Sequence, residues 1–248
     1  MNLLFTPDWF LGRDILIEIF SFVVLSVFFI LCLRNYKLNR NKKTLYLGVG
    51  LLFIALAQAA MAATKFAIFY NTSVTSSIGD FIIQTKVVSS VQIIYGISFF
   101  LFRMFTLLGL YILYRLPTKK NLVGDFLLAF YFIIISAVLG REFYYLFHAT
   151  ALVLLGLITY NYYLLYKQNR FVNTKILTFA FGLLALSQFL FMLSQLEVVY
   201  VIGNLIELVS YLIVLFLIFK ILKHGQKTKP NGYNLRYARH HTGKRWRN

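Results

Sequence analysis

The chain has 248 residues, of which 60% are hydrophobic and 13% charged, and its formal net charge is +17 at pH 7. Soluble domains are about half apolar and about one quarter charged, so this composition excludes an ordinary soluble protein and indicates a membrane protein. The single cysteine, Cys32, excludes a disulfide within the chain and a cysteine-based zinc site. All three prolines lie outside the apolar stretches, which predicts helices without proline kinks.

Seven stretches are long and apolar enough to cross a hydrocarbon core of about 30 Å as helices. The segment 77–92 fits either an interfacial helix or an early start of the third span. We therefore predict an all-α bundle of seven transmembrane helices over residues 1–224, followed by a basic tail over residues 225–248, whose composition is typical of disorder. The predicted spans cover residues 14–33, 44–70, 93–114, 122–140, 143–166, 174–196 and 200–222.

Basic residues gather in alternate loops, and this predicts the orientation of the bundle in a cell membrane. Lys and Arg are enriched in cytoplasmic loops, so the N-terminus is expected outside and the C-terminus inside. The carboxylates gather at the opposite face, except for Asp125, and six or eight helices would break this partition. The basic loop residues are Arg34, Lys37, Arg40, Lys42, Lys43, Arg115, Lys119, Lys120, Lys167, Arg170 and Lys175.

An internal repeat is predicted from two stretches that align without a gap at an offset of 130 residues. They run from Tyr36 to Gln58 and from Tyr166 to Gln188, and nine of the 23 positions are identical. Convergence between short basic loops that lead into apolar helices is the alternative. A true repeat would make spans one to three match spans five to seven in parallel orientation, with span four as the connector.

Polar side chains within the predicted spans form one expected layer in the outer half of the bilayer. Intramembrane ionisable residues are costly and are functional candidates by default. We expect Arg103 to pair with Glu207 or Glu18, and Lys65 to snorkel to the outer interface. The layer either lines a small pocket open to the outside or only bridges helices. The candidate ligand-binding residues are Glu18, Gln58, Arg103, His148, Gln188 and Glu207.

Common catalytic and metal-binding patterns are missing from the sequence. His148 is the only histidine in a predicted span, which excludes a bis-histidine haem and an all-histidine metal site in one chain. The sequence contains no glycine-rich phosphate loop, no GxSxG and no HExxH. We predict a protein that is not an enzyme and that carries no cofactor or metal.

The basic tail is the second candidate binding region. Its charge favours contact with anionic cytoplasmic lipid, and aromatic residues between the arginines also suit RNA or an acidic protein partner. The expected contact residues are Lys227, Lys229, Arg236, Arg239, Lys244, Arg245 and Arg247.

The topology resembles that of seven-helix prokaryotic membrane proteins of the opsin type and of prokaryotic sensor modules, and the composition is typical of prokaryotic and archaeal proteins. The opsin resemblance implies a retinal lysine midway along the last span, but Lys220 and Lys223 lie at its cytoplasmic end. Sugar transporters with Pro-Gln motifs are similar in their repeat, but no span here contains proline. We predict a receptor-like or scaffolding membrane protein. The alternative is a small-solute or ion transporter around Arg103 and Glu207.

Overall fold

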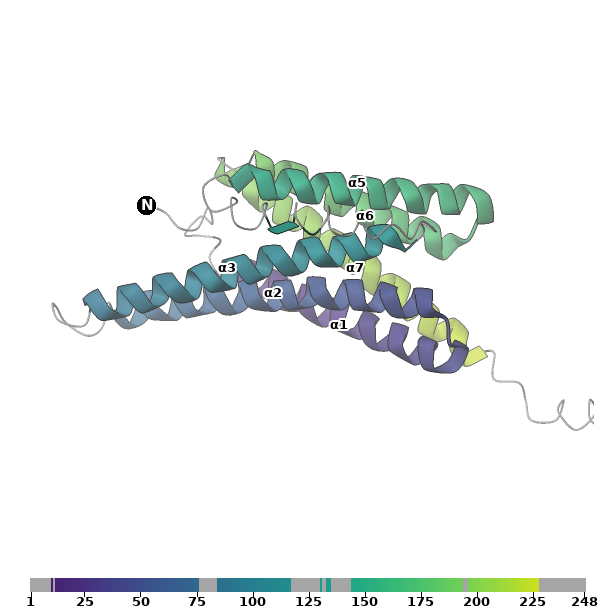
Figure 1. The fold of residues 1–248 in the computed structure, drawn as a ribbon, viewed down its shortest axis with the longest axis horizontal. Helices are drawn as coiled ribbons and strands as arrows, with labels where there is room; N and C mark the ends of the chain where they lie inside the picture. Colours follow the sequence, from purple (N-terminus) through teal and green to yellow (C-terminus); the bar gives the residue numbers. More distant parts are fainter. Residues whose placement is uncertain are drawn as a thin grey trace, which may run out of the picture.

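The computed structural model describes residues 10, 12–75, 84–116, 130, 133–134, 144–193 and 196–227. Within these ranges the chain is all-helical and contains no β-strand, as the sequence predicts. The six helices in Figure 1 are α1 (Arg13–Asn39), α2 (Lys42–Thr75), α3 (Gln84–Arg115), α5 (Tyr144–Asn169), α6 (Val172–Met192) and α7 (Glu197–Lys227).

Each of these six helices contains a segment long and apolar enough to cross a membrane, with 20 to 27 residues per segment. A helix that is apolar all round suits a bundle whose outer faces meet lipid. The outward-facing side chains fit this setting, since Leu16, Ile30 and Phe216 are more than half exposed. The predicted fourth span, residues 122–140, lies largely outside the described residues, and so does the predicted tail from residue 228 onward.

Two short connections have matching backbone geometry. Arg40 follows α1 with a φ of 52°, and Arg170 follows α5 with a φ of 55°, both in the left-handed region. In each case the amide N–H donates over 2.8 Å to the carbonyl of a tyrosine four residues earlier, Tyr36 or Tyr166. This bond closes the last helical turn, and in both cases the next helix starts after a connection of two residues. The two connections are 130 residues apart.

The six described helices form a closed ring. Each packs against its neighbours in the order α1, α2, α3, α5, α6 and α7, and α7 returns to α1. Figure 1 shows α1 to α3 together on one side of the molecule and α5 with α6 on the other. The short connections make α1 and α2 antiparallel, and α5 and α6 likewise.

Contacts between side chains give the relative directions of the helices. Lys65, late in α2, reaches Asp14 at the start of α1 and Tyr200 at the start of α7. Gly109, late in α3, lies against Gly50, early in α2, so α3 runs opposite to α2, and Phe102 of α3 packs on Phe147 at the start of α5. Helices α1, α3, α5 and α7 therefore begin at one end, here called the N-terminal end of the bundle. Because α3 and α5 run in the same direction, the chain leaves α3 at one end and enters α5 at the other.

Polar and apolar side chains separate along the length of the ring. Buried polar residues of the described chain lie toward the N-terminal end or near the middle; examples are Asp14, Lys65 and Asn204. The opposite half is filled by large apolar side chains such as Leu113, Ile158, Leu217 and Ile218. The core therefore has a polar layer toward the N-terminal end. Its other half is filled by the apolar side chains just named, here called the apolar plug.

Candidate ligand pocket

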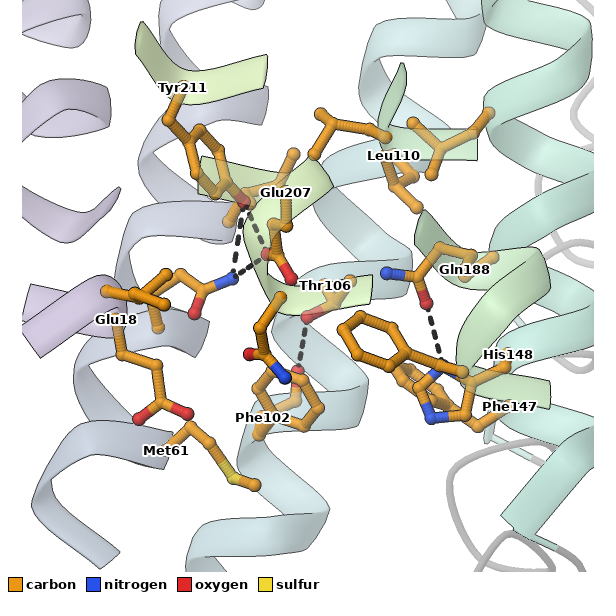
Figure 2. Close-up of a pocket in the computed structure, with 18 of the residues that line it drawn as sticks. Glu18, Met61, Phe102, Thr106, Leu110, Phe147, His148, Gln188, Glu207 and Tyr211 are labelled. Atoms are coloured by element: carbon orange, nitrogen blue, oxygen red, sulfur yellow. Dashed lines mark hydrogen bonds between the residues drawn. The ribbon is translucent and has the colours of Figure 1, made fainter. Parts of the chain in front are cut away.

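A cavity of about 100 Å³ lies within the polar layer, and all six described helices contribute side chains to it. This volume has room for several water molecules or one compact organic molecule. Five of the six side chains that the sequence singles out line the cavity, and Figure 2 labels Glu18, His148, Gln188 and Glu207 among them. They are Glu18, Gln58, His148, Gln188 and Glu207.

One wall of the cavity contains a buried ion cluster around Lys65. The Lys65 Nζ lies 2.7 Å from Asp14 Oδ2, forms a second ion pair with Glu18 Oε1, and donates over 3.3 Å to the Tyr200 hydroxyl. Lys65 is 2% exposed, so the prediction that it snorkels to the interface is wrong. Two carboxylates at the start of α1 compensate for its desolvation, which explains why the ammonium stays inside the ring.

Glu207 is held by two donors on the neighbouring side of the cavity. Gln58 Nε2 and the Tyr211 hydroxyl each donate over 3.0 Å to Glu207 Oε1, and Gln58 Nε2 also lies 3.3 Å from the Tyr211 oxygen (Figure 2). Tyr211 follows Glu207 by four residues, so one face of α7 presents both groups. The arrangement fixes the carboxyl group of a half-buried side chain that lines the cavity.

The opposite wall is made by His148 and Gln188. The His148 Nδ1 lies 2.8 Å from Gln188 Oε1, so the ring nitrogen donates and the amide oxygen accepts. Figure 2 shows the amide nitrogen of Gln188 on the side of the cavity. The His148 ring packs at its edge against Phe147, with centroids 4.9 Å apart, and against Phe191. This wall combines neutral hydrogen-bonding groups with aromatic surface.

Arg103 is buried beside the cavity but does not line it. Its guanidinium carbon lies 4.0 Å from the Phe99 ring centroid and 5.6 Å from that of Phe147, and the side chain is 2% exposed. These rings stabilise the cation through their π faces. The two carboxylates expected as its partners have other contacts, since Glu18 pairs with Lys65 and Glu207 accepts from Gln58 and Tyr211.

Several lining residues were not among those predicted from the sequence. Lys65, Tyr200, Asn204, Tyr211 and Thr106 all reach the cavity. Helical spacing is the signal that would have found some of them: Lys65 lies two turns after Gln58, and Tyr211 lies one turn after Glu207. Tyrosine is counted among the hydrophobic residues of the composition, so its hydroxyl group is easily overlooked.

No protein-family model, curated protein or solved structure matches this chain. The function is therefore inferred from the geometry of the cavity alone.

Proposed function

We propose that this chain is a receptor-like, multi-pass membrane protein that binds a small ligand in the pocket inside its helix ring. The observation that carries the proposal is that five predicted polar residues from α1, α2, α5, α6 and α7 line a single cavity. Polar groups that only bridged helices would not need a cavity of about 100 Å³ between them. Pockets enclosed by several helices, with a few polar groups among apolar ones, are typical of small-ligand sites.

The proposed topology has seven crossings, with the pocket facing outward. The parallel directions of α3 and α5 support it, because the connection between them has to return along the full length of the bundle. The described basic residues at the connections after α1 and α5 support a cytoplasmic location for the end opposite the pocket. These residues are Arg34, Lys37, Arg40, Lys42, Lys43, Lys167, Arg170 and Lys175.

The proposal includes the parallel repeat of three helices, one connector and three helices. The matching geometry at Arg40 and Arg170 supports it, and so do the cavity residues on the first two helices of each unit. At the offset of 130 residues, every cavity residue of α1 and all but one of α2 has a partner that also lines the cavity. The pairs are Ile17 with Phe147, Glu18 with His148, Ile54 with Leu184, Gln58 with Gln188 and Met61 with Phe191.

A transporter is the second candidate, because parallel repeats are known from transporters. Transport requires a polar route from the pocket to both membrane faces. The described residues beyond the pocket pack as an apolar plug that includes Leu113, Val214 and Leu217. That packing favours a receptor over a transporter. Any signal would then pass to a separate partner, and the basic tail remains the proposed contact for anionic lipid, RNA or an acidic protein.

Thermal unfolding of the purified protein in the presence of a broad set of small molecules tests ligand binding. A true ligand at about 100 times its Kd is expected to raise Tm by about 5–10 °C. In His148→Phe, the ligand concentration needed for the same rise in Tm should be at least roughly tenfold higher. The substitution removes the contact with Gln188 and changes the pocket wall. Tyr160→Phe is the matched control, because Tyr160 lies on the surface of α5 and is 59% exposed. This variant should respond like the wild-type protein.

Two outcomes would contradict the proposal. One is that no compound stabilises the wild-type protein. The other is that every stabilising compound acts equally on the folded His148→Phe variant, which would place binding outside the cavity.

A further inference from the structure

The charges around the cavity are unequally distributed between its two walls. In the proposed repeat, Glu18 on α1 corresponds to His148 on α5, and α7 adds Glu207 to the wall that contains Glu18. The described residues of the wall formed by His148 and Gln188 include hydrogen-bonding groups but no carboxylate. Among the described residues, the pocket therefore has one acidic wall and one neutral wall.

Lys65 contacts one of the two carboxyl groups that line the cavity. Its ammonium forms ion pairs with Asp14 and Glu18 and donates to Tyr200, whereas Glu207 accepts from Gln58 and Tyr211. The Glu18 Oε2 atom is buried and has no hydrogen-bond partner among the described residues. A buried carboxylate oxygen without a partner is costly, and a donor supplied by a ligand would remove that cost.

Glu207 is the second carboxyl group that lines the cavity. Gln58 and Tyr211 both donate to its Oε1, and these two contacts hold the carboxyl group in place. Arg103 is the other buried cation near the cavity, but it lies over the faces of Phe99 and Phe147 and does not line the cavity.

The rest of the lining fits the body of an organic cation. Four phenylalanine rings, from Phe99, Phe102, Phe147 and Phe191, line the cavity, and aromatic faces attract ammonium groups. The residues of the described chain contain no group of three or more His, Cys, Asp or Glu side chains arranged to hold a metal ion. The lining thus offers carboxylates for a charge and rings for a compact apolar group.

From this geometry we infer that the pocket binds a small organic ammonium ion, with its nitrogen between Glu18 and Glu207 and its apolar part against the phenylalanine rings. The inference rests on the proposed ligand-binding function and names the chemical class of the ligand. The cavity volume of about 100 Å³ favours a compact ligand.

Thermal unfolding with matched small molecules tests this assignment. Methylammonium, propylammonium and benzylammonium are compared with propanol, propionate, sodium, potassium and calcium at equal ionic strength. We expect at least one ammonium ion to raise Tm by about 5–10 °C when saturating, and the neutral and anionic analogues to have no comparable effect. Glu207→Gln should weaken the ammonium response roughly 30-fold or more, because it removes the charge but keeps an oxygen acceptor.

Glu197→Gln is the matched control, since Glu197 lies on the same helix and is exposed. It should respond to ammonium ions like the wild-type protein. The assignment is overturned if propanol, propionate or a metal ion stabilises the protein better than every ammonium ion. If the stabilising compound is not an ammonium ion and its effect is lost in His148→Phe, the ligand pocket is still supported, and only the ammonium assignment fails. The assignment also fails if the ammonium response is unchanged in the folded Glu207→Gln variant, or if no compound has any effect.

Discussion

Replacing Lys65 by methionine is expected to lower the free energy of unfolding by about 3–5 kcal/mol. The change removes the ammonium between Asp14 and Glu18 and leaves two buried carboxylates without this cation. Equilibrium unfolding in mixed detergent micelles measures the loss. Lys43→Met on the same helix is the control, because Lys43 is exposed, and it should cost less than about 1 kcal/mol.

A rescue experiment separates the charge effect from a packing effect. Adding Asp14→Asn and Glu18→Gln to Lys65→Met removes the buried charges together, and most of the lost stability should return. A loss in Lys65→Met as small as that in Lys43→Met would contradict the buried ion cluster and favour a lysine that reaches the membrane interface.

Replacing Gly109 by alanine is expected to lower the free energy of unfolding by about 2–3 kcal/mol. A Cβ atom at this position would lie 2.6 Å from the Gly50 carbonyl oxygen and 2.7 Å from Ile54 Cγ1. Both contacts belong to α2, so α2 and α3 would have to separate where small residues now let their backbones approach closely. The same unfolding assay measures the effect.

Gly156→Ala is the matched control for this prediction. Beyond the adjacent backbone of α5, no atom of the described residues lies within 4 Å of a Cβ at Gly156, so alanine there should be neutral or stabilising by up to about 1 kcal/mol through its higher helix propensity. Equal stability of the two variants would contradict the close packing of α2 on α3.

The helices and much of the pocket follow from the sequence for a simple physical reason. Apolar runs without proline have to be helical in a membrane, and a rise of about 1.5 Å per residue then gives the depth of each polar side chain. Depth alone correctly brought Glu18, Gln58, His148, Gln188 and Glu207 into one layer. It does not give the direction in which a side chain points around its helix.

Lys65 and Arg103 show what depth cannot predict. Lys65 lies near the end of its apolar run, where snorkelling is the usual expectation, yet the start of α1 places two carboxylates within its reach. Arg103 was expected to pair with Glu18 or Glu207, but these two carboxyl groups contact Lys65, Gln58 and Tyr211, and the Arg103 guanidinium lies on aromatic rings from α3 and α5. Both outcomes depend on which helices are neighbours in the ring, and hydropathy contains no information about neighbours.

Access to a cysteine placed in the pocket tests the central claim most directly. Cys32 is the only cysteine, so Cys32→Ala gives a background in which Thr106→Cys is the single thiol. Thr106 lines the cavity, and Ile218→Cys in the apolar plug is the control. In sealed vesicles of known orientation, we predict that a small charged thiol reagent modifies position 106 from the outer side only and leaves position 218 unmodified. Reaction at position 106 from both sides would indicate a transport route, and no reaction from either side would contradict an accessible pocket.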